Sequence, residues 1–114
     1  MNNNIEDLIQ RRRLQLLIHS CIYYHLNQNI ISDKQWDAWA KELVDLQKQY
    51  PEESKRVIWY EAFKDWDAST GAFLPITDEW VIQKSKYLIH IFRNYNPKKE
   101  PIKSIKKLGR KKLF

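Results

Sequence analysis

The stretch "IYYHLNQNIISDKQWDAWAKEL", residues 22–43, joins the end of one amphipathic segment to the start of another. Its "NQN" at 27–29 predicts a helix end, because asparagine tolerates the left-handed conformation and satisfies terminal backbone groups. Ser32 then suits the N-cap of a new helix, and Gln35, three residues later, completes a capping box. The stretch therefore predicts two helices that meet at a short corner surrounded by tyrosine, histidine, aspartate and tryptophan side chains.

Apolar residues recur at three- and four-residue steps on both sides of this corner, which is the helical pattern. The expected helices run from about Asn4 to Leu26, from Ser32 to about Gln49, through residues 52–66, and from a Thr77 N-cap past Arg93. In the last helix the expected apolar stripe is Trp80 or Val81, Lys84, Tyr87 or Leu88, and Ile91. The two glycines of the chain are too few for the tight turns of a β-sandwich or barrel. The predicted fold class is all-α, a small bundle of about four helices.

Positive charge is concentrated at the C-terminal end of the sequence. The net charge is +6, whereas residues 97–114 alone carry +7, so residues 1–96 carry −1. Pro97 and Pro101 oppose helix formation in the basic segment. We therefore expect a helical domain over residues 1–96 and a basic, largely unstructured tail over 97–114. The three arginines at 11–13 are expected on the solvent side of the first helix, with their stems on apolar neighbours.

A basic tail of this kind is expected to contact a polyanion rather than to contribute to the fold. Nucleic acid is the expected partner, bound without base readout, because neutralised phosphates release condensed counterions. The alternative is a charge run that only keeps the chain in solution. The cationic residues of the tail are Lys98, Lys99, Lys103, Lys106, Lys107, Arg110, Lys111 and Lys112.

Metal sites, disulfides and membrane spans are not expected. The three histidines stand apart, and neither paired cysteines nor HExxH spacing occurs. The single cysteine, Cys21, cannot form an intrachain disulfide, which favours a cytoplasmic location. The start "MNNNIEDL" does not resemble a signal peptide, and no apolar run approaches the roughly 18 residues of a membrane helix.

The corner gathers groups that can bind a small polar ligand. Asp33, Trp36 and Asp37 fall at i, i+3 and i+4, so they share one face of the second helix. Tyr24 and His25 are expected nearby because the connection is short. This set offers an aromatic face for stacking and two carboxylates that accept N–H or O–H groups, which suits a flat ligand with an amide and ribose hydroxyls. The alternative is structural: the carboxylates favour a helix start, and the tryptophan packs in the core.

The longer stretch "IYYHLNQNIISDKQWDAWAKELVDLQKQYPE" resembles the small helical domain at the N-terminus of NAD-dependent bacterial DNA ligases, over about residues 8–53. The likeness is in the order and spacing of a tyrosine pair, Ile-Ser-Asp and Asp-x-x-aromatic-Asp. In that family the domain recognises the nicotinamide mononucleotide (NMN) half of NAD. The resemblance implies a site of Tyr24, His25, Asp33, Trp36 and Asp37. The tyrosine and tryptophan would flank the nicotinamide, and the aspartates would accept from ribose or carboxamide groups.

Two departures from the family pattern accompany this resemblance. Trp36 stands where the family usually has tyrosine, and the corner loop is one residue shorter. Lys-x-Asp-Gly, which carries the lysine nucleophile of nucleotidyl transfer, is absent from the sequence. The expected function is therefore a non-catalytic module that binds NAD or NMN weakly, with the basic tail for nucleic acid. NAD hydrolysis is not expected, because Asp33 and Asp37 have no evident cause for a raised pKa.

The alternative function is that of an interaction protein. In this reading the chain is a phage or mobile-element accessory protein or inhibitor, whose helical scaffold binds a host protein or nucleoprotein complex such as a CRISPR effector. Trp66, between two aspartates and beside a long loop, is the expected exposed anchor of such an interface.

Overall fold

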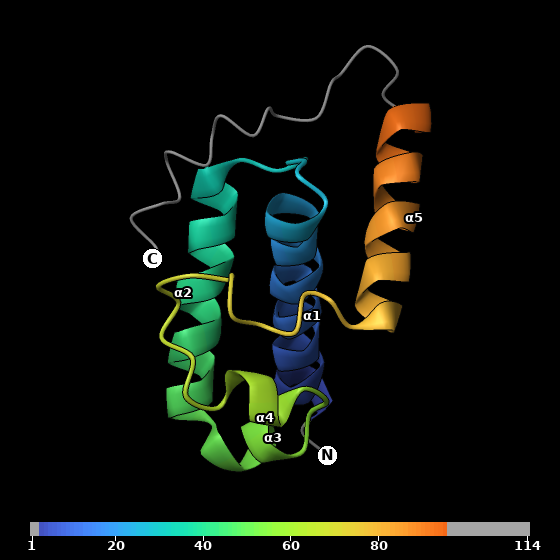
Figure 1. Cartoon of the computed structure of the whole chain (residues 1–114). Coiled ribbons are helices and arrows are strands. Elements are labelled where there is room, and N and C mark those ends of the chain that lie inside the picture. The colour runs from blue at the N-terminus through green and yellow to red at the C-terminus, as the bar shows by residue number, and fades with distance from the viewer. Residues whose placement is uncertain (1–2, 96–114) are drawn as a thin grey trace.

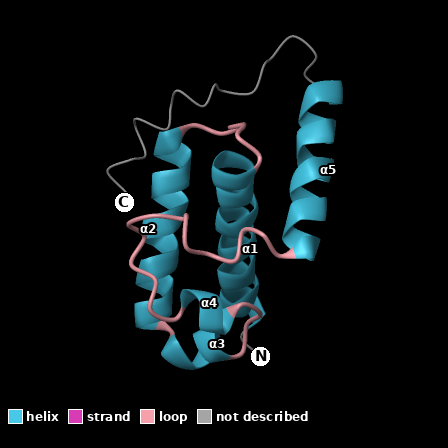
Figure 2. Cartoon of the chain, viewed as in Figure 1, coloured by secondary structure: helices cyan, strands magenta, loops and turns pink. Residues whose placement is uncertain are grey.

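The computed structural model describes residues 3–95, and every regular element in that range is a helix (Figure 2). In chain order the elements are α1 (Asn3–Ser20), the π-helical turn η1 (Cys21–His25), α2 (Asp33–Gln49), α3 (Pro51–Lys55), α4 (Tyr60–Phe63) and α5 (Glu79–Tyr95). Because residues 3–95 contain no strand, the all-α prediction is confirmed for this part of the chain. The predicted tail, residues 97–114, lies outside the described residues.

The three long helices lie side by side, with α1 between α2 and α5 (Figure 1). The short helices α3 and α4 close one end of this layer. Residues 64–78 then run back along α2 and cross α1 before they reach α5. The corner between η1 and α2 lies at the opposite end from α3 and α4, so the returning segment is the part of the second half that approaches it.

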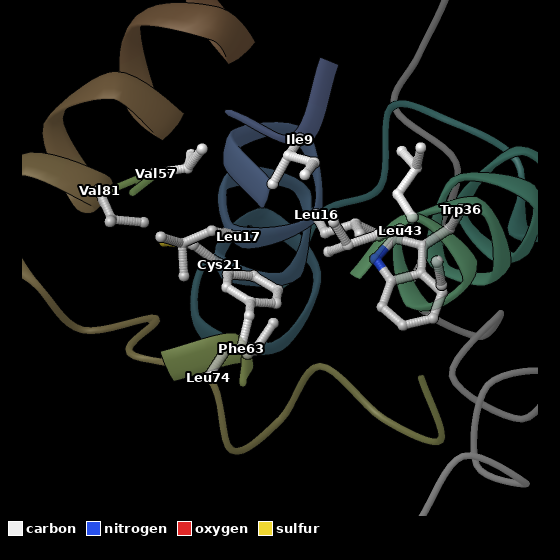
Figure 3. Close-up of a cluster of buried hydrophobic side chains, with 12 residues drawn as sticks. Ile9, Leu16, Leu17, Cys21, Trp36, Leu43, Val57, Phe63, Leu74 and Val81 are labelled. Atoms are coloured by element: carbon white, nitrogen blue, oxygen red, sulfur yellow. The ribbon is translucent and has the colours of Figure 1, made fainter. Parts of the chain in front are cut away.

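The core lies where α1 faces the other elements (Figure 3). Burying a large apolar side chain stabilises the fold by about 1.5–3 kcal/mol. The buried cluster draws on every long helix and also on the returning segment, through Leu74. Its fully buried members are Ile9, Leu16, Leu17, Cys21, Trp36, Leu43, Phe63 and Val81. The returning segment is therefore packed into the core and is part of the fold.

The corner forms much as the sequence predicts. Asn27 has a positive φ of 60°, so it ends the first helix in the left-handed conformation. The Ser32 hydroxyl accepts a hydrogen bond of 3.0 Å from the Gln35 N–H, the expected N-cap of α2. The last turn before the corner is wider than an α-helical turn, with the Leu26 N–H donating to the Cys21 carbonyl at 2.9 Å.

The single helix expected over residues 52–66 is wrong. Two short helices, α3 and α4, occupy this region, and Trp59 between them adopts a left-handed conformation with φ 71°. A helix that ends inside a protein leaves carbonyl groups that need donors. The carbonyls of Ser54, Val57 and Ile58 find theirs in one side chain of α1, the guanidinium of Arg13.

Arg13 is completely buried, which corrects the expectation that all three arginines at 11–13 face solvent. Its two terminal nitrogens donate to the three carbonyls over 2.9–3.1 Å and to the Ser54 hydroxyl at 2.6 Å. Its Nε donates to Gln47 Oε1 of α2 at 3.0 Å. Desolvation by burial lowers the pKa of Arg13 to about 10, which keeps the group charged at neutral pH. One cation thus joins α1, α2 and the break between α3 and α4.

Helix α5 begins one residue later and faces another way than the sequence suggests. Asp78, and not Thr77, caps it, with Oδ1 accepting from the Val81 N–H at 3.1 Å. Its buried face consists of Val81, Ser85 and Ile89, and the Ser85 hydroxyl donates to the Ile18 carbonyl of α1 at 3.3 Å. The expected stripe was therefore wrong at the two aromatic positions, since Trp80 and Tyr87 are exposed.

We expect Arg13→Met to lower the free energy of unfolding by at least about 3 kcal/mol. Each buried acceptor left without a donor costs about 1–3 kcal/mol, and this change removes the donors of several. Urea denaturation followed by circular dichroism measures the loss. Arg11→Met, at an exposed position of the same helix, is the matched control and should change stability by less than about 0.5 kcal/mol. Equal stability of the two variants would contradict the role given to Arg13.

Candidate ligand-binding corner

The five residues that the sequence assigns to a ligand lie on two adjoining elements. Tyr24 and His25 end the π-helical turn η1. Asp33 opens α2, and Trp36 and Asp37 follow one turn later. Their exposures differ: the histidine is exposed, while Tyr24 and the two aspartates are partly buried.

Trp36 is fully buried, with a relative exposure of 0%. Its Nε1 donates to the Ser20 hydroxyl of α1 at 3.3 Å, and its ring belongs to the core in Figure 3. The expectation of an open stacking face is therefore corrected. In this structure the ring has no surface on which a ligand can stack, and the structural alternative describes it.

Residues 66–74, which we call the covering loop, close the corner. The Trp66 ring meets the Trp36 ring edge-on, with centroids 5.9 Å apart. Its Nε1 donates to the Thr70 carbonyl at 2.7 Å, which fixes the shape of the loop. The Thr70 hydroxyl lies 3.3 Å from the Tyr24 hydroxyl. Both aromatic residues of the predicted site thus contact this loop.

Trp66 is not the exposed anchor that the sequence suggests. It is partly buried, and its ring also packs edge-on against Phe63 with centroids 5.3 Å apart. Among the described residues, the large apolar side chains that are exposed are instead Ile58, Phe73, Trp80 and Tyr87.

Gly71 makes the closest approach of the covering loop to the corner. A Cβ atom at this position would overlap the Ser20 hydroxyl oxygen and lie 2.8 Å from Ser20 Cβ. It would also lie 3.1 Å from Cζ2 of Trp36, closer than such contacts normally come. The absence of a side chain at Gly71 therefore allows the loop to seat on the two helices that form the corner.

The start of the covering loop is held by a local turn. The Ser69 N–H donates to Asp67 Oδ1 at 2.9 Å, and hydrogen bonds from Ser69 hold the pKa of Asp67 below its usual range. Ala68 between them has a φ of 70°, a conformation that costs a residue with a side chain roughly 1–2 kcal/mol. The loop therefore closes at a local cost, which its contacts to Tyr24 and Trp36 offset.

A groove of about 310 Å³ runs beside the corner, between α2 and the start of the covering loop. Of the five predicted ligand-binding residues, Asp37 alone lines it. The other lining residues are Ala40, Lys41, Val44, Asp45, Asp67 and Ala68. Three carboxylates against one lysine make this groove suitable for hydrogen-bond donors and unsuitable for a bare phosphate.

Metal sites and membrane spans can be considered only for residues 3–95. In this range no group of three or more histidine, cysteine, aspartate or glutamate side chains is arranged to hold a metal ion. None of the described helices is both long and apolar enough to cross a membrane.

A helix pair with an aromatic and acidic corner suits a class of small nucleotide-recognition domains, and comparison with known proteins gives the family. Residues 2–56 match the family model described as the DNA ligase-like, N-terminal NAD+-binding domain. The resemblance to NAD-dependent DNA ligases is thereby confirmed for this segment.

Three curated DNA ligases are similar over the same region. The ligase of Bacteroides fragilis is 44% identical over 48 residues, which is 42% of this chain. Those of Petrotoga mobilis and Pseudothermotoga lettingae are 41% and 39% identical over 49 residues, or 43% of this chain. The match spans 7% of the length of each ligase. No solved structure matches the chain significantly.

The matched segment ends within the break between α3 and α4, so the covering loop and α5 lie beyond it. Sequence reasoning centred on the resemblance therefore missed the residues that seat the loop: Ser20, Thr70 and Gly71. The available signal was the run "ASTG" at 68–71, since consecutive small residues permit close backbone approach.

We expect Gly71→Ala to displace the covering loop while the helices stay folded. The added methyl group overlaps Ser20, and overpacking of this kind costs about 1–3 kcal/mol. Amide hydrogen exchange should become faster in residues 66–74, with an unchanged helical circular dichroism spectrum. Phe73→Ala, a side chain of the same loop that is 86% exposed, should leave the exchange unchanged. Unaltered exchange in Gly71→Ala would show that the loop does not depend on this contact.

Proposed function

We propose that this chain is a non-catalytic binding module for the NMN part of NAD. The observation that carries the proposal is the match of residues 2–56 to an NAD+-binding domain, together with a corner in which Tyr24, Asp33 and Asp37 keep part of their surface exposed. The proposal rests on the family of the segment and not on an empty cavity of nicotinamide shape.

In this proposal the aspartates are the main recognition groups. Asp33 and Asp37 accept hydrogen bonds from the ribose hydroxyls or the carboxamide, and His25 lies exposed at the rim. Tyr24 offers its ring, while its hydroxyl lies against Thr70 of the covering loop. Stacking on Trp36 requires the covering loop to move, because that ring has no exposed surface.

The affinity expected for such a site is low. Stacking on an aromatic side chain contributes about 1–3 kcal/mol, and each hydrogen bond to a carboxylate about 1.5–3 kcal/mol. Association costs at least about 4 kcal/mol, which leaves a dissociation constant in the millimolar to high-micromolar range. Opening the covering loop reduces the affinity further, since a ligand that requires a minor conformation binds in proportion to its population.

Millimolar NMN should shift the amide resonances of Tyr24, Asp33 and Asp37 in heteronuclear NMR spectra. We expect Asp37→Asn to weaken binding about tenfold or more, because it replaces a charged acceptor by a neutral one. Asp7→Asn, which changes an exposed carboxylate at the far end of α1, is the control and should bind like the unchanged protein.

Gly71→Ala separates a closed site from an absent one. If the covering loop restricts the corner, this variant should bind NMN more tightly than the unchanged protein. Without any NMN-induced shift in either protein, the NMN proposal fails. Shifts that persist in Asp37→Asn would remove Asp37 from the site.

We further expect no covalent chemistry with NAD. Nucleotidyl transfer in ligases needs a lysine that attacks the adenylate phosphorus, and the sequence contains no Lys-x-Asp-Gly. Intact mass spectrometry after incubation with NAD and magnesium should therefore show the unmodified protein. An added adenylate mass would contradict the non-catalytic role.

A second candidate function is that of an interaction protein, for which the closed corner is a scaffold. The favouring observation is that four large apolar side chains are exposed among residues 3–95 while Trp36 is sealed. In this proposal the partner is a protein or nucleoprotein complex, as for an accessory or inhibitory protein of a mobile element. Affinity capture from the native cell, with Trp80→Ala as the comparison bait, tests it: partners captured equally by both baits would exclude this face as their contact.

The basic segment 97–114 has its own proposed role, a contact with nucleic acid phosphates through its eight lysine and arginine residues. The support is its charge of +7 against −1 for the remainder of the chain.

A further inference from the structure

One face of α5 presents two aromatic rings and a cation to solvent. Trp80 is 45% exposed and Tyr87 is 61% exposed, although both are large and partly apolar. Lys84 lies between them, with its Nζ 5.7 Å from the centroid of the Trp80 ring. At positions i, i+4 and i+7 the three side chains follow one line along the helix. We call this line the aromatic face.

Packing of the described fold does not explain the aromatic face. Val81, Ser85 and Ile89 on the other side of α5 hold it to α1, and they are buried. The two exposed rings add nothing to that contact. Exposed tryptophan and tyrosine side chains that line up on one element mark an interaction surface more often than a packing defect.

The aromatic face begins at a pocket of about 380 Å³ lined by Ile58, Trp59, Asp78 and Trp80. Two indole rings contribute to its wall, which suits a flat ring as occupant. Trp59 is held there at a cost: its φ is 71°, and its buried Nε1 has no hydrogen-bond partner among the described residues. Each of these features normally destabilises a fold, so stability alone does not account for the placement.

Charge selects among the partners that offer flat rings. Beyond Glu79, the charged residues of α5 are Lys84, Lys86 and Arg93, and the sequence after the helix carries +7 over residues 97–114. A partner that combines unstacked planar rings with regularly spaced negative charges is single-stranded nucleic acid. Duplex DNA keeps its bases stacked inside and does not offer them to a tryptophan or tyrosine on a helix surface.

We propose that the aromatic face of α5 binds single-stranded nucleic acid. One base enters the pocket beside Trp80, and a further base stacks on Tyr87. The backbone runs past Lys84 toward the basic segment 97–114, and away from the carboxylate of Asp78. This inference adds base stacking to the proposed phosphate contacts of that segment, and it is independent of NMN binding at the corner.

The test uses the full-length chain and a fluorescent oligothymidylate, with binding followed by anisotropy. Trp80→Ala and Tyr87→Ala should each weaken binding by about 5- to 100-fold, the range measured for stacked bases. Tyr87→Phe should bind like the unchanged protein, because stacking needs the ring and not the hydroxyl. Phe73→Ala, which removes an exposed aromatic ring outside α5, is the matched control and should have no effect.

Salt dependence separates stacking from phosphate contacts. Lys84→Gln should reduce the slope of log affinity against log salt by about one. The two aromatic variants should lower affinity and leave that slope unchanged. Circular dichroism of each variant should match the unchanged protein, since all three side chains are exposed.

Three outcomes would overturn the proposal. The first is no binding of the oligothymidylate by the full-length protein at low salt. The second is equal binding by Trp80→Ala, Tyr87→Ala and the unchanged protein, which would assign all affinity to phosphate contacts. The third is duplex DNA of the same length binding as tightly as the single strand. None of these outcomes bears on the shifts expected with NMN.

Discussion

The guanidinium of Arg13 is the group on which the arrangement of the helices depends. The chain must reverse after α2, and it does so through two short helices separated by a break with unpaired carbonyls. Arg13 reaches these carbonyls from α1 while Gln47 of α2 accepts from its Nε. A planar group with five donors can satisfy such a set, and a lysine cannot. Because the break directs the chain back along α2, the same contact determines where the covering loop begins.

The two halves of the chain then meet at one place. The first half, which matches the ligase domain, supplies the corner with Tyr24, Trp36 and the two aspartates. The second half supplies the covering loop, whose Gly71 lies against Ser20 and Trp36. Segments of similar sequence can therefore differ in access to the same residues, because the remainder of the chain covers them to different extents. Here the carboxylates stay at the surface and the tryptophan becomes part of the core.

Local signals in the sequence predicted the corner and failed for contacts between distant residues. Asn27, Ser32 and Gln35 act within a few residues of themselves, so their roles could be inferred from spacing alone. The burial of Arg13 could not, because its acceptors lie 41–45 residues away and arginine is rarely buried. Trp36 was ambiguous for the same reason. Its position on α2 was correct, but its burial depends on a loop more than thirty residues later.

The π-helical turn η1 has a consequence for how such sequences are aligned. Each hydrogen-bonded ring in this turn encloses one residue more than an α-helical ring, so η1 takes up chain length without lengthening the helix. Tyr24 and His25 are therefore rotated relative to the positions that a uniform helix would give them. A change of one residue in the adjoining connection can be absorbed by such a turn while the flanking helices keep their phase. Residue counts across this corner are consequently a poor guide to which side chains occupy equivalent positions in space.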